Sequence, residues 1–266
     1  MKVFKKDFKE NLKTAIIWTL AAALMGFLQV SVYGSMVSTS IDQWETMLDT
    51  MPKAMIDAFE ITSSTFDDIL SYYAMEGYLY VTLLISVFAA LLGARLINKE
   101  ESEKTSEFIL TKPISRFRYI TEKLFTLIIM IILSNITAAI IIYIGMLVGS
   151  NAAFSTSVFV GYSLGTLVVS ISFGLIAFMI SAVVKRVKGL SGMALGIVFL
   201  SFFLGIVSNI SDTFSNLQYL SLFEYMGATD IINNTIPIYS YIVFICVIGL
   251  SIFFTYRIYL KKDIYN

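Results

Sequence analysis

The sequence contains no histidine and one cysteine, Cys246, which lies within an apolar run. Histidine is the commonest general base and the commonest metal ligand, so its absence argues against zinc hydrolysis and serine–histidine catalysis. A lone cysteine has no partner in the chain for a disulfide or a metal site. We therefore interpret Cys246 as a small, buried apolar residue.

Charge is also scarce. Charged residues make up 14% of the 266 residues and hydrophobic residues 57%, whereas a soluble chain has about 25% charged residues. Long uncharged runs recur along the whole chain and leave little sequence for a soluble domain. The composition predicts one transmembrane domain over residues 1–266.

Six stretches are long and apolar enough to cross a membrane, which takes about 20 residues of helix. They cover residues 15–35, 77–97, 124–149, 158–184, 190–208 and 238–259. The first follows several lysines, as in a signal peptide, but its apolar run is too long and no cleavage site follows. We predict an all-α integral membrane protein with six transmembrane helices, the first of them retained.

The loop charges predict the orientation, because lysine and arginine favour the cytoplasmic side. Of the 19 basic residues, 18 fall in the N-terminal segment, the loop after the second stretch, the loop after the fourth and the C-terminal segment. Both termini and loop 98–123 are therefore predicted to be cytoplasmic, and loops 38–76 and 209–237 extracellular. The localisation that follows is a multi-pass protein of the plasma membrane.

The sequence lacks several features that particular functions require: a phosphate-binding motif, charges within the spans and a net positive charge. It has no G-x-x-x-x-G-K-[ST] phosphate loop, so ATP hydrolysis would require a partner, and we predict a non-enzyme without a cofactor or metal of its own. With Arg95 and Arg257 counted among the flanking cations, none of the six stretches contains a charged residue. Proton- or sodium-coupled transport and intramembrane aspartyl proteolysis both need such residues. The formal net charge of zero gives no basic field for nucleic acid.

The cytoplasmic loop 98–123 carries the most informative pattern. Its charged residues run as far as Glu107 and give way abruptly to Phe108, Ile109 and Leu110, after which Pro113 breaks the element. An apolar tip beyond the membrane surface suits a groove on a soluble partner. The alternative is that the tip folds back onto the bundle.

Helical patterns also occur at the N-terminus and in the first outer loop. Phe4, Phe8 and Leu12 recur at four-residue spacing among lysines, which predicts an amphipathic helix over residues 1–14 that anchors in the membrane interface or touches a cytoplasmic partner. In loop 38–76 the pattern predicts short helices, with a break at Pro52 and acidic residues in the first turn of a helix near Ser64.

Small residues four positions apart mark two of the predicted spans. Gly161 and Gly165 lie in the fourth, and Gly192 and Gly196 in the fifth. Such spacing lets helices approach closely in lipid. These faces are interpreted as packing within one bundle, with a subunit interface as the alternative.

The motifs together resemble those of a known family. The residues that carry the resemblance are Met51–Ala54 with Phe59, Glu76–Gly77, Glu100–Glu101, Lys104–Thr105, Phe108–Leu110, Pro113–Arg116 and Lys123. They are similar to the pattern of permease subunits of ATP-binding-cassette (ABC) exporters of the type-2 class. Lys104 departs from it, because the family commonly has glycine before the threonine.

The resemblance implies an ABC type-2 exporter-like bundle that pairs with a second permease, identical or similar, on two copies of a separate ABC ATPase. The ATPase would bind ATP and Mg, and the permeases would contact membrane lipid but no nucleic acid. The residues implied to form the coupling helix and its exit are Glu100, Glu101, Thr105, Glu107, Phe108, Ile109, Leu110, Pro113 and Arg116. Phe4, Phe8 and Leu12 would lie on a connecting helix along the inner face.

The function expected from these observations is export of a hydrophobic or amphipathic substrate, such as a peptide, lipid or drug, because the span interiors are uncharged. The alternative is a non-transporting immunity or sensor protein that binds a toxic peptide or a cytoplasmic partner. Secondary transport ranks third because intramembrane charges are missing.

Overall fold

The computed structural model describes residues 2–58, 68–102, 115–150, 153–184, 189–210 and 212–261. The described regular elements are all helical, and six helices are long and apolar enough to cross a membrane. They are α1 (Lys2–Thr50), α4 (Tyr78–Ser102), α6 (Arg116–Gly149), α7 (Thr156–Val183), α8 (Leu190–Ile210) and α10 (Ile238–Lys261). This confirms the prediction of an all-α membrane protein with six spans.

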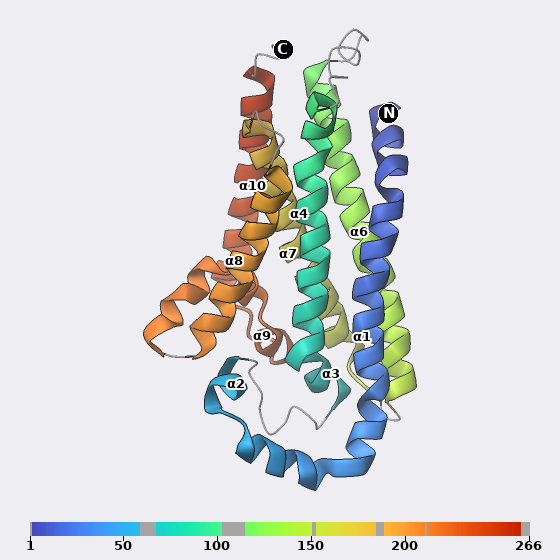
Figure 1. Ribbon diagram of the computed structural model, residues 1–266, viewed down its shortest axis with the longest axis vertical. Coiled ribbons are helices and arrows are strands. Elements are labelled where there is room, and N and C mark those ends of the chain that lie inside the picture. The colour runs from blue at the N-terminus through green and yellow to red at the C-terminus, as the bar shows by residue number, and fades with distance from the viewer. Residues whose placement is uncertain are drawn as a thin grey trace.

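The long helices run side by side, and the start of α1 and the end of α10 lie at the same end of the bundle (Figure 1). We call this the terminal end and the opposite one the distal end. In lipid every backbone polar group must be satisfied within the chain, so uncharged runs of this length form helices. The assignment of the terminal end to the cytoplasm stays a prediction from the loop charges.

The helices begin where the local sequence supplies caps. The Ser115 side chain accepts a hydrogen bond from the backbone N–H of Arg118 at 3.3 Å and caps α6. The Asp68 carboxylate accepts from the N–H groups of Leu70 and Ser71 at 2.7 and 2.9 Å and caps the short α3 (Ile69–Tyr72), which one turn of π-helix, η2 (Tyr73–Gly77), joins to α4. The described helix begins at Ile69, so Asp68 precedes it as a cap and does not lie in its first turn as predicted, and Ser64 lies outside the described residues.

Two predicted boundaries need correction. The connecting helix expected over residues 1–14 is not a separate element, because α1 continues without a break from Lys2 through the first span to Thr50. The predicted loop 98–123 is also shorter, since α4 continues to Ser102 and α6 begins at Arg116. Hydropathy marks only the apolar part of a helix, whereas its hydrogen-bonded backbone extends through polar residues at both ends. The break at Pro52 is present between α1 and α2 (Lys53–Ala58).

The predicted outer loop 209–237 folds back into the bundle. It forms η3 (Asp212–Leu220), η4 (Glu224–Met226) and α9 (Ala228–Ile232). Phe223 is 5% exposed, and its ring centroid lies 5.3 Å from that of Phe173 on α7 and 5.8 Å from that of Phe202 on α8. The Tyr78 hydroxyl donates to the Met226 carbonyl oxygen at 2.8 Å. Residues 221–232, which we call the re-entrant segment, are therefore part of the core, whereas η3 is mostly exposed.

Glycines set the closest helix contacts. Gly93 of α4 lies against the backbone of Gly174 on α7, so that an added Cβ would collide with the Gly174 carbonyl oxygen. In α7, Gly165 lies against Tyr78 and Ile231, which supports the interpretation of packing within one bundle for the fourth span. This interpretation is wrong for the fifth span.

A Cβ added at Gly192 or Gly196 of α8 would meet no described atom within 4 Å. These two glycines therefore face away from the bundle. The single cysteine also faces outward: Cys246 on α10 is exposed, contrary to the prediction that it is buried. Both differences have the same cause, because a span that contacts neighbours on one side turns its other residues to the lipid whatever their chemistry.

Candidate functional site

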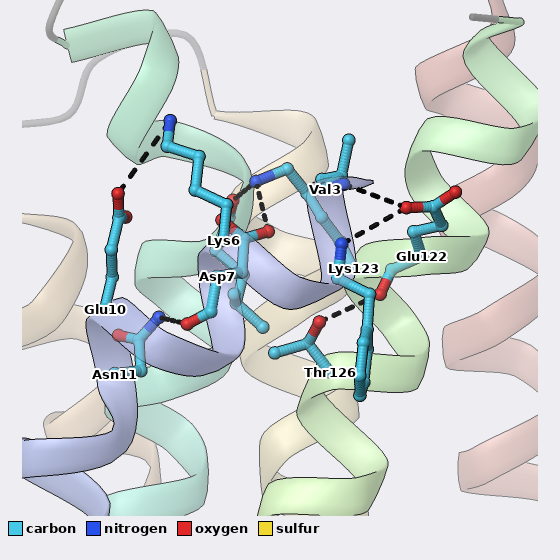
Figure 2. Close-up of polar contacts among 10 residues, drawn as sticks. Val3, Lys6, Asp7, Glu10, Asn11, Glu122, Lys123 and Thr126 are labelled. Atoms are coloured by element: carbon cyan, nitrogen blue, oxygen red, sulfur yellow. Dashed lines mark hydrogen bonds and ion pairs between the residues drawn. The ribbon is translucent and has the colours of Figure 1, made fainter. Parts of the chain in front are cut away.

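Four charged side chains meet at the terminal end, where the start of α6 packs against the start of α1 and the end of α4. They are Asp7, Arg118, Glu122 and Lys123, and we call them the charge cluster. Figure 2 shows three of them, Asp7, Glu122 and Lys123. Asp7 comes from α1 and the other three from the first two turns of α6. More than a hundred residues of sequence separate the two parts.

Lys123 and Asp7 form a buried ion pair. Lys123 Nζ lies 3.1 Å from Asp7 Oδ2, and the two side chains are 1% and 4% exposed. The same ammonium donates to the Leu96 carbonyl oxygen of α4 at 2.5 Å and lies 4.9 Å from the centre of the Tyr119 ring. A charge is tolerated at such a place only when partners of this kind replace its hydration. One ammonium group thus holds α1, α4 and α6 together.

Glu122, the residue before Lys123, belongs to α6 but caps the N-terminus of α1. Its Oε2 accepts hydrogen bonds from the backbone N–H groups of Val3 and Phe4 at 3.0 and 3.2 Å. N–H groups in the first turn of a helix have no partner within the helix, and the helix dipole favours an anion there. Arg118 Nε donates to Glu122 Oε1 at 3.1 Å and orients the carboxylate. Adjacent residues of α6 therefore bind the first two turns of α1.

The charge cluster joins three helices at the terminal end of the bundle. The part of the chain that the structure describes contains no group of ligands placed to hold a metal ion. The charges of the cluster are paired with one another or bound to backbone groups. Leu96 precedes the predicted coupling segment in the sequence, and Lys123 follows it. Contacts of Lys123 and Glu122 join both flanks of that segment to α1.

The structure describes three of the nine predicted coupling residues. Glu100 and Glu101 are on the last turn of α4, and Arg116 is the first residue of α6. The remaining predicted residues, Thr105, Glu107, Phe108, Ile109, Leu110 and Pro113, lie outside the described residues. The coupling helix itself stays a prediction.

The face of α1 that packs on the bundle differs from the one the sequence analysis chose. Val3 and Asp7 are buried, Phe4 and Phe8 are partly buried, and Leu12 is 41% exposed. The Phe4–Phe8–Leu12 face therefore borders the contact surface, and the Val3–Asp7 face forms it. The sequence analysis missed Asp7 and Glu122 as functional candidates. One available signal was Asp7 itself, an acidic residue at helical spacing from apolar Val3 within a basic segment.

The chain matches a known protein family over nearly its whole length. A family model described as ABC-2 family transporter protein matches residues 1–264. No curated protein matches the chain. The family match includes α1 with its charge-cluster residue Asp7, both helices that flank the predicted coupling loop, and the re-entrant segment before α10.

Proposed function

Since the chain belongs to the ABC-2 transporter family, we propose that it exports a hydrophobic or amphipathic substrate across the plasma membrane, driven by a separate ATPase. Membership makes the chain a permease subunit of an ABC transporter and a multi-pass membrane protein. The proposal adds the direction of transport, the class of substrate and the source of energy. The observation that carries it is the family match over nearly the whole chain.

The proposed assembly contains two permeases and two ATPase subunits, with ATP and Mg bound by the ATPases. The absence of a phosphate loop from the sequence supports the need for such a partner. The uncharged spans support an apolar or amphipathic cargo, because an ion would need polar groups along its path. Family membership also favours this function over a stand-alone immunity or sensor protein.

In the proposed mechanism, closure of the ATPase dimer pushes on the segment Glu100–Leu110. The charge cluster supports the route of the force from there. Leu96 lies on the helix before this segment and Lys123 on the helix after it, and the Lys123 ammonium contacts both the Leu96 carbonyl oxygen and Asp7 of α1. A push on the loop then moves α1, α4 and α6 as one unit at the terminal end. The movement changes the side of the membrane toward which the path between the two permeases opens.

The test is ATP-dependent transport by the permease reconstituted in lipid vesicles with its ATPase. Phe108→Asp places a charge on the predicted apolar tip, and we expect it to abolish transport while the protein still inserts and purifies normally. The matched control is Leu260→Asp, a charge at an exposed position of α10 near the same end of the bundle. Full transport by the Phe108→Asp variant would show that the coupling assignment is wrong. Transport by the wild type without any ATPase would refute the proposed function.

A further inference from the structure

A shallow groove of about 260 Å³ lies on the outward side of α6 at the terminal end. It is lined by Phe117, Arg118, Thr121, Glu122 and Phe125. Tyr256 of α10 lies beside it, with its ring centroid 5.2 Å from that of Phe117 and its hydroxyl oxygen 2.8 Å from that of Thr121. The groove thus has a floor formed by α6 and lies next to α10.

The lining combines exposed apolar rings with one exposed cation. Phe117 and Phe125 are 58% and 50% exposed, and the Arg118 side chain is 63% exposed. A guanidinium has five N–H donors, and the contact with Glu122 uses only Nε. The Glu122 charge is itself bound by the N–H groups of Val3 and Phe4. The terminal amino groups of Arg118 are therefore available to an external anion.

The position of the groove along α6 indicates which anion fits. Beyond Phe125 the exposed face of the helix continues in apolar residues: Leu133, Ile136, Ile140, Ile144 and Leu147. Phe125 lies seven residues after Arg118, roughly 10 Å further along the helix at ~1.5 Å per residue. Each interfacial region of a bilayer is about 5–7 Å thick. When Arg118 is level with lipid phosphates, Phe125 is therefore level with acyl chains.

We propose that this groove binds one anionic phospholipid, with its phosphate on Arg118 and its first acyl carbons against Phe117 and Phe125. Charge complementarity favours an anionic over a neutral lipid, because Lys5, Lys9 and other exposed cations surround the terminal end. Since Arg118 also orients Glu122, which caps α1, the bound lipid stabilises the junction of α1 with α6. This lipid site does not depend on what the protein transports.

The proposal is tested on the purified full chain in neutral detergent, by native mass spectrometry during titration with phosphatidylglycerol or phosphatidylcholine. We expect the wild type to bind the first phosphatidylglycerol more tightly than phosphatidylcholine. Arg118→Gln should weaken phosphatidylglycerol binding about fivefold, the typical effect of one basic residue near an anionic membrane surface. Arg95→Gln is the matched control, since Arg95 is exposed at the same end on α4. The affinity of this variant for phosphatidylglycerol should equal that of the wild type. Equal binding of the two lipids by the wild type, or equal effects of the two variants, would overturn the proposal.

Two further arms separate the parts of the site. Phe125→Ala should weaken phosphatidylglycerol binding, and Leu133→Ala, at a similarly exposed position outside the groove, should not. Arg118→Lys, which retains the charge, should keep most of the affinity and shows that the position tolerates substitution. Inorganic phosphate at the same concentration should not compete with the lipid. If it displaces the lipid completely, or if Phe125→Ala binds like the wild type, the site is not a lipid site.

Discussion

The buried Lys123–Asp7 pair makes a quantitative prediction about stability. Lys123→Met keeps the length of the side chain but leaves the Asp7 carboxylate, 4% exposed, without its ammonium partner. Removal of one member of a buried ion pair costs about 3–5 kcal/mol, because the other charge stays buried and loses the opposite charge that compensated it. Asp7→Leu removes the carboxylate that lies 3.1 Å from the buried ammonium and should cost a similar amount.

The double variant distinguishes a true pair from two unrelated sites. With both members of the pair removed neither is left uncompensated, so the loss should be smaller than that of either single variant. The expected interaction energy is then at least about 3 kcal/mol. A variant that exchanges the two charges should be less stable than the double apolar variant. The Leu96 carbonyl oxygen, which accepts from Lys123 in the wild type, would then face a carboxylate.

The assay is unfolding by SDS in mixed micelles, followed by tryptophan fluorescence. The chain has two tryptophans, so a Trp44→Phe background leaves Trp18, which packs against the core from α1, as the reporter. Lys9→Met is the control, because Lys9 is exposed on the same helix, and it should change stability by no more than about 0.5 kcal/mol. Additive losses in the double variant would refute the argument that the pair joins α1 to α6.

Two further predictions concern helix packing, and the same unfolding assay measures both. Gly93→Ala should destabilise by about 1–3 kcal/mol, because the new Cβ collides with the Gly174 carbonyl oxygen, whereas Gly192→Ala, at an open position, should be neutral or stabilising. Similar effects at the two glycines would contradict the α4–α7 contact. Phe223→Ala should cost about 3–5 kcal/mol, because its ring is buried against α7 and α8, while Phe214→Ala on the exposed surface of η3 should cost little. A small loss at Phe223 would place the re-entrant segment outside the core.

The two faces with paired small residues show how far sequence patterns reach. Gly161–Gly165 and Gly192–Gly196 have the same spacing, yet Gly161 and Gly165 contact other helices of the bundle and Gly192 and Gly196 face away from it. The spacing specifies that a close approach is possible, but the neighbour that makes the approach comes from the arrangement of helices. The re-entrant segment was missed for a related reason. Its apolar run around Phe223 is too short to span a membrane, so hydropathy assigned it to a loop.

The sequence by itself determined the class of protein and the number of spans. Uncharged runs of about 20 residues have one stable form in lipid, the helix, so their count and order follow from composition alone. The motif residues likewise indicated the family that the family model then matched. These conclusions depend on local properties of the sequence, which can be read from any short stretch without knowledge of the fold.

The charge cluster was decided by the tertiary structure. In the loop counts Lys123 was one of 18 basic residues on the predicted cytoplasmic side, and Asp7 was one acidic residue among lysines. The fold brings them within 3.1 Å of each other and removes both from solvent. A hydropathy window cannot detect a pair separated by 116 residues, because burial of a charge depends on which helices become neighbours. The sequence therefore determined that six helices form, and the packing of α1 against α6 and α4 determined that Asp7 and Lys123 meet as a buried ion pair.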